Sequence, residues 1–315
     1  MTLLRVATYN VYLGADLTLI FGVRNSAHLL EQAGLVYQQL VGTDFPSRAE
    51  AIARLIARER IDIIGLQEVA RWSLSPLRGD GLQGEPVLWC DFLTELLHAL
   101  ARLEFPYDAH AINSNFGGGS AISDEQAMSV LGFNVILVRR DSEIAVTASA
   151  RGVFKASFDI ATGIDDLVLN ISRSWGWVDA TVGDIALRFV NTHTEAYDAD
   201  TRHAQRDELL REVGDPATPV VIVGDFNSGP NTVDMPAAYT DAWTAGGVDG
   251  PGYTCGQAAD LANEESQLAE RIDYIWVRDA TVASCRVIGD IDTDRTHAKR
   301  LWPSDHACVI SDLRL

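Results

Sequence analysis

Short runs of apolar residues, separated by turn-forming residues, predict a chain built mostly of β-strands. The clearest run is 220–223, where four consecutive β-branched residues predict a strand buried on both faces. Gly183-Asp184 is a turn signal between two such runs and predicts a hairpin. A second hairpin is expected from 152–160 and 167–171. The remaining strand patterns occupy residues 3–11, 61–69, 107–112, 130–138, 175–182, 185–191, 271–277, 282–288 and 307–310.

Apolar residues at helical spacing predict helices between some of these strands. Ser47 followed by Glu50 is a capping-box pattern, which predicts that a helix starts at residue 47. This helix would connect the strands at 3–11 and 61–69, so these two strands should be parallel neighbours. Further helices are predicted at 27–40, 89–103 and 199–213, the last with caps at Asp198 and Gly214.

The connecting segments favour one compact domain over residues 1–315, because the chain has no repeat, linker or low-complexity stretch. Residues 14–45 form a long link that we interpret as an extra helix and loop over one end of the sheet. Residues 71–86 and 113–123 are rich in glycine and other turn formers, and both predict surface loops that could shape a pocket.

Charge and composition narrow the class of protein. The 315-residue chain has a formal net charge of −19, which disfavours electrostatic capture of long nucleic acid without excluding it. It has neither an 18-residue apolar run nor a signal-peptide pattern, so a cytoplasmic protein is the simplest interpretation; a secreted protein with its leader removed would look the same. The four cysteines lack metal-ligand spacing, and a disulfide between Cys285 and Cys308 stays open.

Polar side chains suited to binding a metal or a phosphate recur where predicted strands begin or end. Each has an ordinary explanation when taken singly: Asn10 could begin a turn, and His193 could be a core histidine. Their recurrence at the ends of so many strands predicts a shared site, because ligands of α/β folds bind at strand ends. These residues are Asn10, Glu68, His193, Asp225, Asn227, Asp273, Asp305 and His306.

This set of residue types fits the hydrolysis of a phosphoester. Hard divalent cations such as Mg²⁺ prefer oxygen ligands and typically take one or two carboxylates from the protein. Histidines move protons near neutral pH, particularly beside a carboxylate, and asparagine donors suit the charged oxygens of a transition state. The sequence has no nucleophile-elbow, phosphate-loop or zinc-protease motif that would favour another chemistry.

The motifs that contain these residues resemble, in order, those of the endonuclease/exonuclease/phosphatase superfamily, which includes deoxyribonucleases, neutral sphingomyelinases and inositol polyphosphate 5-phosphatases. The resemblance runs from the first strand to the last. It implies a four-layer α/β sandwich, in which helices flank two packed mixed β-sheets, and metal-dependent phosphoester hydrolysis. The motifs are Thr8-Tyr9-Asn10, Leu66-Gln67-Glu68-Val69, Asn191-Thr192-His193, Gly224-Asp225-Phe226-Asn227, Arg271-Ile272-Asp273-Tyr274-Ile275 and Ser304-Asp305-His306.

The resemblance also implies a role for each residue. Glu68 would be the main ligand of Mg²⁺, with Mn²⁺ as a possible substitute, and Asn10 and Asp305 would lie near the metal. The other roles concern water, protons and phosphate. Asp225 would orient or deprotonate the attacking water, Asn227 would hold a phosphate oxygen, Asp273 would pair with His306, and His306 would contact the phosphate or act as the acid–base.

His193 matches the histidine of the deoxyribonuclease, sphingomyelinase and 5-phosphatase branches, which disfavours the apurinic endonuclease branch. The chain departs from the family at Thr194, where leucine is common, and at Tyr12, where some branches have an acid. It also lacks a clear counterpart of the catalytic tyrosine or carboxylate that several branches have in the middle region, for which Tyr107 and Asp108 are the candidates.

The substrate is the least determined feature. Trp175 and Trp177 lie two apart and hence on one face of a strand, where they would line the substrate site, touch a lipid surface or pack in the core. The acidic charge favours a small phosphodiester, a phospholipid headgroup or a phosphomonoester over long duplex DNA. The alternatives are a nonspecific metal-dependent endonuclease and a catalytically silent binding module of the same fold. No obligate protein partner is indicated.

Overall fold

The computed structural model describes residues 2–78, 81–82, 85–165, 167–248 and 250–315, and its strands form two large mixed sheets. The first sheet has, in spatial order, β15 (Thr281–Ile288), β16 (Cys308–Arg314), β1 (Leu3–Asn10), β2 (Ile63–Arg78), β6 (Gln126–Arg139) and β5 (Tyr107–Ala121), with β3 (Gly81–Leu82) and β4 (Val87–Asp91) beside β2. The second sheet has β13 (Thr240–Asp241), β14 (Asp273–Arg278), β12 (Val220–Asp225), β11 (Ile185–His193), β10 (Ser174–Val182) and β7 (Ile144–Val153).

The described residues form few helices. These helices are η1 (Leu17–Ile20), α1 (Ser26–Gly42), α2 (Phe45–Glu59), α3 (Phe92–Arg102), α4 (Ala199–Val213), α5 (Ala242–Gly246) and η2 (Asp292–Asp294). Strands β8 (Phe158–Ala161) and β9 (Val168–Ile171) form a separate hairpin. The predicted caps of α4 are confirmed: the Asp198 side chain accepts from the Thr201 amide, and Gly214 ends the helix.

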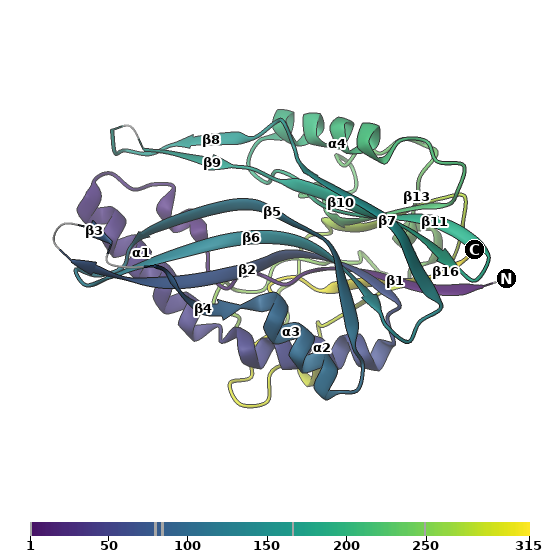
Figure 1. Cartoon of the computed structure of the whole chain (residues 1–315), viewed down its shortest axis with the longest axis horizontal. Helices are drawn as coiled ribbons and strands as arrows, with labels where there is room; N and C mark the ends of the chain where they lie inside the picture. Colours follow the sequence, from purple (N-terminus) through teal and green to yellow (C-terminus); the bar gives the residue numbers. More distant parts are fainter. Residues whose placement is uncertain (1, 79–80, 83–84, 166, 249) are drawn as a thin grey trace.

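The two sheets and the helices on their outer faces form four layers (Figure 1). Three apolar cores hold these layers together. One lies between the first sheet and helices α1 to α3, and contains Ile52 and Phe92. The second core lies between the two sheets and contains Val6 of the first sheet and Val221 of the second sheet. The third packs Leu209 of α4 against the outer face of the second sheet. The four-layer α/β sandwich is therefore confirmed.

The strand at 220–223 has the predicted burial, since all four side chains are fully inaccessible. Strands β1 and β2 are parallel neighbours, also as predicted. Strands β11 and β12 form the second parallel pair. The turn at Gly183-Asp184 joins β10 and β11 in antiparallel register, which confirms that hairpin.

Both predicted surface loops are largely strands, and these predictions were wrong. Strand β2 continues to Arg78 and β5 continues to Ala121, because β6 lies between them and pairs with both over most of its length. Together the three strands form an arm that extends beyond the second sheet (Figure 1). Backbone pairing with β6 holds Gly117 to Gly119 in a strand although their sequence is typical of a loop.

Three local predictions also need correction. Helix α2 begins at Phe45 with a proline in its first turn, so Ser47 lies inside the helix and its hydroxyl donates to Asp44 at 3.0 Å instead of capping. Helix α3 begins at Phe92, and the preceding residues pair with β2 as β4. The segment at 152–160 is divided between the end of β7 and strand β8.

All four cysteines are free, so the open disulfide between Cys285 and Cys308 does not form. Among the residues described, no helix combines the length and apolar character that crossing a membrane requires.

Candidate active site

The ends of the central strands bring all eight predicted residues to one edge of the two sheets. Asn10 ends β1 and lies beside Gln67 of the parallel strand β2, while His193 of β11 lies beside Asp225 of β12. Strand β14 runs antiparallel to β12, so its first residue, Asp273, pairs with Asp225. The segment before β16 carries Asp305 and His306 to the same edge.

Asn10 connects the two sheets at this edge. Its Nδ2 donates to Glu68 Oε1 at 3.1 Å and to Asp225 Oδ2 at 3.0 Å, so one amide group contacts carboxylates from both sheets. Its Oδ1 accepts from the Tyr12 amide at 3.0 Å, which fixes the orientation of the amide. Both hydrogens of Nδ2 are used, and Asn10 therefore holds the two carboxylates at a fixed separation.

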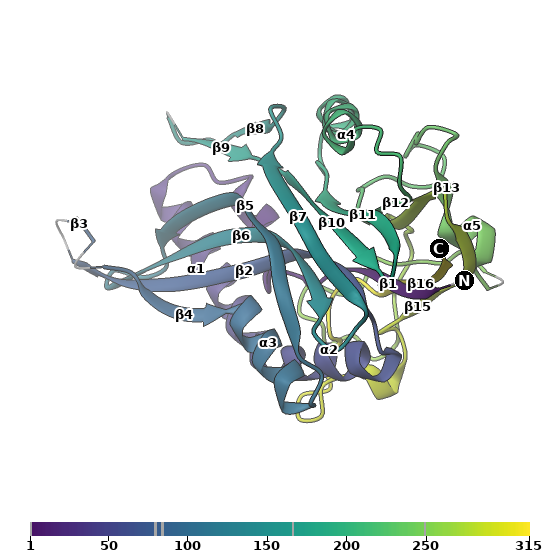
Figure 2. The ribbon, with the colours of Figure 1, turned by 45° about the vertical axis from the view of Figure 1, so that its right-hand side comes forward.

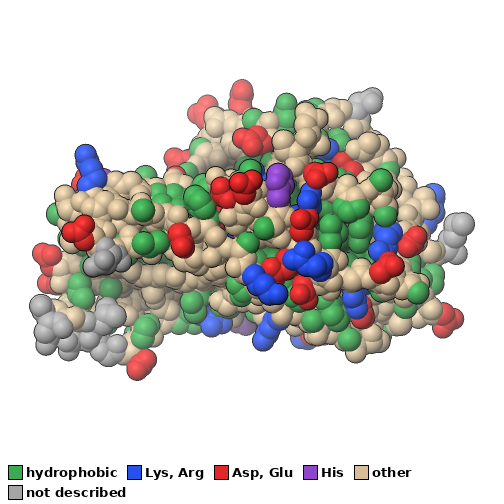
Figure 3. Space-filling view, turned by 90° about the horizontal axis from the view of Figure 1, so that it is seen from above, with side chains coloured by type: hydrophobic (Ala, Val, Ile, Leu, Met, Phe, Trp, Pro, Cys, Tyr) green, Lys and Arg blue, Asp and Glu red, His purple; other side chains and the backbone are tan. Residues whose placement is uncertain are grey.

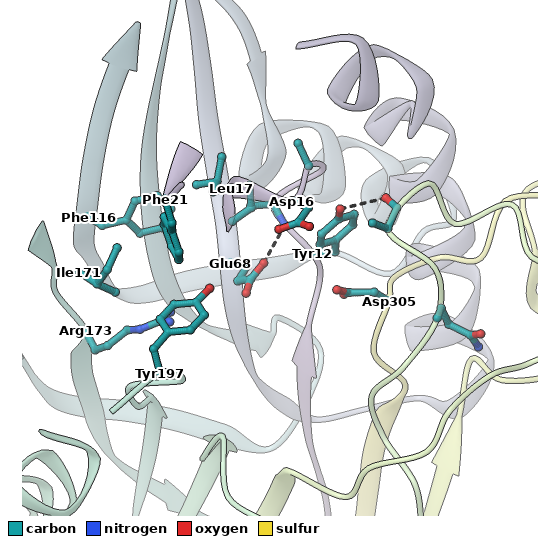
Figure 4. Close-up of a pocket in the computed structure, with 14 residues that line it drawn as sticks. Tyr12, Asp16, Leu17, Phe21, Glu68, Phe116, Ile171, Arg173, Tyr197 and Asp305 are labelled. Carbon is teal, nitrogen blue, oxygen red and sulfur yellow. Dashed lines mark hydrogen bonds between the residues drawn. The ribbon is translucent and has the colours of Figure 1, made fainter. Parts of the chain in front are cut away.

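Glu68 lies at an irregularity in β2, where the pairing with β6 shifts register between Leu66 and Val69. Its φ of 57° is in the left-handed region, which a residue with a side chain rarely adopts. The shift turns the side chain toward the adjoining pocket, where Oε2 accepts from the Leu13 amide at 3.0 Å (Figure 4). Such irregularities commonly re-aim a side chain at an active site.

Asp225 is the centre of the contacts on the buried side of this edge. Its Oδ1 accepts from the Asn227 amide at 2.9 Å, and its Oδ2 lies 3.5 Å from His193 Nε2 and 3.8 Å from His306 Nε2. Burial, together with the nearby charge of Asp273, raises the pKa of Asp225 to about 7. Near neutral pH this carboxyl group can therefore exchange a proton.

His306 and Asp273 form the pair that the family resemblance implied, with Nδ1 of the histidine 2.8 Å from Oδ2 of the aspartate. Burial opposes the charged imidazolium, but Cys255, Asp273 and Asp305 together hold the pKa of His306 well above its usual range. His306 therefore carries a proton at neutral pH, and its Nε2 faces Asp225.

His193 has the opposite electrostatic environment. It is 2% exposed, and burial and the neighbouring Arg173 guanidinium hold its pKa well below the usual range. The Nη1 of Arg173 lies 3.2 Å from His193 Nε2, and Arg173 Nε lies 3.6 Å from the buried Glu195. The imidazole is therefore neutral, and one of its nitrogens can accept a hydrogen bond from Arg173.

A pocket of about 340 Å³ opens beside these residues (Figure 4). Glu68 and Asp305 lie in its middle, with Arg173 and Tyr197 on one side. Asp16 also lines it, so three of the charged lining groups are acids and one is a cation. The pocket thus presents carboxylates to solvent, whereas Asp225 and the two histidines lie behind them.

Two sets of side chains at this edge are candidates for holding a divalent cation. Asp225, Asp273 and His306 offer ligand atoms within 4.8 Å of one another, but His306 Nδ1 is engaged by Asp273. Glu68 and Asp305 face the open pocket and offer oxygen, the donor that Mg²⁺ prefers.

The environment of Asp305 favours the second set. Burial raises its pKa to about 6, the Glu68 carboxylate adds to this shift, and its described hydrogen bond comes from the neutral Ser304 hydroxyl. The acids Asp16, Glu68 and Asp305 outnumber Arg173 in the described lining of this pocket, so the oxygen donors of Glu68 and Asp305 fit a divalent metal ion.

The two tryptophans lie away from the pocket lining. Trp175 is 7% exposed and belongs to the core under α4, and Trp177 packs against that core with the Arg188 guanidinium 4.0 Å from its ring centre. These contacts match the core-packing alternative.

Tyr107 and Asp108, the candidates for a catalytic tyrosine or carboxylate in the middle region, lie far from the other site residues. Tyr107 is buried and donates to the Ile61 carbonyl, and Asp108 pairs with the exposed Arg140 at 2.8 Å. Both lie at the start of β5, beside the end of β6, opposite the edge that carries Asn10. Thr194 has a local role instead, since its hydroxyl donates to the Phe226 carbonyl at 2.7 Å.

Sequence analysis missed Arg173, Tyr197 and Asp16, which line the pocket. Arg173 comes one residue before β10, next to a run of buried strand residues. Because arginine is rarely buried without a partner, its place beside this run was a signal in the sequence that it could belong to a site. Tyr197 stacks edge-on against Phe21 at 5.1 Å, a contact between distant segments that no local pattern predicts.

Comparison with solved structures identifies the fold. Truncated TDP2 from Caenorhabditis elegans has a TM-score of 0.61 at 17% identity, over 99% of this chain and 98% of that one. A mannosyl-6-phosphatase from Bacteroides thetaiotaomicron VPI-5482 has a TM-score of 0.61 at 19% identity, over 99% and 100%. TDP2 from D. rerio, complexed with a single-strand DNA product, has a TM-score of 0.60 at 16% identity, over 100% of both chains.

Comparison with curated protein sequences finds no significant match. The sequence profile of the Endonuclease/Exonuclease/phosphatase family, in contrast, matches residues 7–306, from β1 to the segment that holds His306. This match covers nearly the whole chain and includes all eight residues gathered at the strand ends. The protein belongs to the Endonuclease/Exonuclease/phosphatase family and is a phosphoester hydrolase.

Proposed function

We propose that the protein is a divalent-metal-dependent phosphodiesterase that acts on a small phosphodiester or a lipid-headgroup phosphodiester by in-line attack of water. The observation that carries the proposal is the double contact of Asn10. It joins Glu68, which faces the pocket, to Asp225, which lies among the proton-carrying groups. Metal ligand and proton acceptor are thereby held beside one pocket.

Glu68 and Asp305 are the proposed ligands of Mg²⁺, for which Mn²⁺ could substitute, with Asn10 supporting Glu68. A bound divalent cation supplies positive charge against the phosphate oxygens as the leaving oxygen departs. The pocket's own cation is Arg173, so the carboxylates need this added charge to accept an anionic substrate.

Asp225 is the proposed base. With a pKa of about 7, Asp225 can orient a water molecule through one carboxylate oxygen and accept a proton from that water. The backbone N–H of Asn227 donates to its other oxygen, Oδ1, at 2.9 Å. His193 is proposed to keep Asp225 and Arg173 in place rather than donate a proton, since its pKa is lowered by burial and by Arg173.

His306 is the proposed acid. The Asp273 carboxylate orients its ring and stabilises its proton, which suits transfer to a leaving alkoxide. The proposed phosphate donors are Arg173 and Asn227. The Nδ2 of Asn227 already donates to the Thr194 carbonyl at 2.9 Å, so one of its two hydrogens remains for a phosphate oxygen.

The charge of the pocket favours a diester over a monoester. Besides Glu68 and Asp305, Asp16 adds a negative charge, and Arg173 is the one cationic side chain among the lining residues that the structure describes. A phosphodiester carries one negative charge, whereas a monoester carries nearly two at neutral pH and would be repelled more strongly.

A nonspecific endonuclease is the second candidate, because the TDP2 relative is complexed with a DNA product. Against it stands the net charge of −19. On the face that includes α4, acidic and basic side chains are interspersed (Figure 3).

The test is the hydrolysis of bis-(p-nitrophenyl) phosphate and of p-nitrophenyl phosphate, each with Mg²⁺, with Mn²⁺ and with EDTA. Metal-dependent turnover that favours the diester would support the proposal, and preference for the monoester would overturn the diesterase assignment. Plasmid nicking with Mg²⁺ that Glu68→Ala abolishes would favour the endonuclease instead. No turnover of any substrate despite metal binding would favour the silent binding module.

A further inference from the structure

A second cavity, of about 510 Å³, adjoins the catalytic pocket, and we call it the apolar pocket. Its walls come from η1 and α1 on one side, from β5 and β6, and from the β9 strand of the β8–β9 hairpin. The hairpin lies along the arm formed by β2, β5 and β6 (Figures 1 and 2). A backbone hydrogen bond of 2.7 Å from Gly163 to the Val23 carbonyl joins the hairpin to the segment after η1.

The apolar pocket and the catalytic pocket are continuous. Leu17, Phe21, Phe116 and Ile171 line both, and they lie on the Arg173 side of Glu68 (Figure 4). A group attached to a phosphate beside Glu68 would therefore lie next to the apolar pocket.

The lining of the apolar pocket favours a hydrocarbon over a polar occupant. Among the residues that the structure describes, none that lines this pocket is charged. Three of its polar side chains are engaged within the protein: Asn170 donates to Asp159 at 2.7 Å, Ser172 to the Asn115 carbonyl at 2.6 Å, and Ser120 to the Ala121 carbonyl at 3.2 Å. A sugar or nucleobase would lose its hydrogen bonds to water without replacement, so the lining selects a hydrocarbon.

The glycines of β5 give the pocket its width. Gly118 pairs with the buried Val130 and lies two residues after Phe116, so both patterns place its missing side chain on the pocket face. A Cβ added at Gly118 would meet no heavy atom within 4 Å, and its φ lies outside the range that side chains avoid. The pocket can therefore be filled from this position without backbone strain.

From this geometry we infer that the substrate is an amphiphilic phosphodiester whose hydrocarbon chain occupies the apolar pocket while its phosphate lies beside Glu68 and Asp305. The inference rests on the proposed function and names the substrate class for that site. It also gives the long 14–45 link a role, because Leu17 and Ile20 of η1 and Val36 of α1 form one wall of the chain-binding pocket.

The experiment compares p-nitrophenyl methyl, butyl and octyl phosphodiesters with Mg²⁺, all below the concentrations at which they form micelles. Each methylene that becomes buried should raise kcat/KM about fourfold, so the octyl ester should exceed the methyl ester by at least about 100-fold. A flat series, or a gain that appears only above the micelle concentration, would overturn the inference while leaving the phosphodiesterase intact.

Gly118→Leu should lower kcat/KM for the octyl ester at least about tenfold more than it lowers kcat/KM for the methyl ester. Gly42→Leu is the matched control: it adds the same side chain to open space at the end of α1, outside both pockets, and should change neither. Equal effects of the two variants on the octyl ester would contradict the assignment of the pocket.

A binding measurement separates this inference from the proposed function. In EDTA, 1-octanol should raise the thermal denaturation midpoint of the protein and of Gly42→Leu, but not that of Gly118→Leu. If no diester is hydrolysed and this pattern holds, the apolar pocket stands and the proposed catalysis fails. If octanol stabilises all three proteins equally, the pocket assignment fails.

Discussion

Asn10 of the first sheet and Asp225 of the second meet at 3.0 Å, and this hydrogen bond joins the two layers at the catalytic edge. The same Asn10 nitrogen donates to Glu68, so one side chain sets the distance between the proposed metal ligand and the proposed base. The reaction therefore depends on how the sheets are packed, as well as on which residues end the strands.

Asn10→Ala should lower kcat by about 10- to 100-fold, the usual cost of losing a group that orients a metal ligand. Steady-state kinetics on a diester would show this. Asn113→Ala is a matched control, because Asn113 is also a buried amide that bonds to the second sheet, at 2.8 Å from the Gly152 carbonyl. Loss of stability in both variants but of activity only in the first is the expected result; equal losses of activity would reduce Asn10 to a packing residue.

Arg173→Ala should lower kcat/KM at least about tenfold by removing the cationic side chain of the catalytic pocket. Arg173→Lys should recover part of the loss, since it keeps the charge but lacks the planar guanidinium. Arg206→Ala is the control variant. It removes an arginine that pairs with two exposed acids, Asp207 and Asp234, outside the catalytic pocket. Wild-type kinetics for Arg173→Ala would exclude a role in binding the phosphate.

Gly65→Ala should destabilise the fold by about 1–3 kcal/mol, because it inserts a methyl group between the sheets. The added carbon would lie 2.6 Å from Asn191 Oδ1 and 2.6 Å from a Val223 methyl group. Urea denaturation would measure the change. Gly42→Ala adds the same group where no atom lies within 4 Å, and it should cost no stability. Unchanged stability of Gly65→Ala would mean that the sheets can move apart freely.

The ion pair of Asp312 with Arg5 predicts how stability depends on pH. Burial opposes the charged carboxylate, but hydrogen bonds from Arg5, at 2.6 Å, and Ser284 hold the pKa of Asp312 below its usual value. A carboxylate with a depressed pKa stabilises the folded protein at pH values above its unfolded pKa of about 3.9. This stabilisation is lost as the pH falls through the folded pKa. Asp312→Asn should therefore lower the denaturation midpoint at neutral pH.

This difference between wild type and Asp312→Asn should shrink as the pH falls below the unfolded pKa and through the lower folded pKa, where the wild-type carboxylate becomes protonated as well. Thermal denaturation from neutral to acidic pH measures it. A difference that stays constant over the whole range would attribute the effect to packing rather than to charge.

Local signals explain which parts of the fold could be predicted from sequence. Four β-branched residues at 220–223 gave a buried strand, and Asp198 and Gly214 gave the ends of α4. The ends of β2 and β5 were missed because the sequence there is typical of loops, and only pairing with the distant strand β6 makes them strands.

The site was predictable in composition but not in geometry. The ordered motifs predicted eight site residues, which the fold brings to one edge, and the pairing of Asp273 with His306, which the structure shows; the roles of the eight residues stay predictions. Arg173 and the two adjoining pockets were not predictable, because they arise where segments distant in the chain pack together. Trp175 lies in the core under α4, which does not support its predicted role in substrate binding. Side-chain alternation predicts which face of a strand a residue occupies, but not which layer covers that face.

The most direct test of the account is the Mg²⁺ dependence of bis-(p-nitrophenyl) phosphate hydrolysis by the wild type, Glu68→Gln and Asp108→Asn. Asp108 is the matched control, an acid in an exposed ion pair at the opposite edge. We expect turnover that EDTA abolishes, a loss of at least about 100-fold in Glu68→Gln, and unchanged kinetics in Asp108→Asn. Hydrolysis by Glu68→Gln at the wild-type rate, or turnover that persists in EDTA, would contradict it.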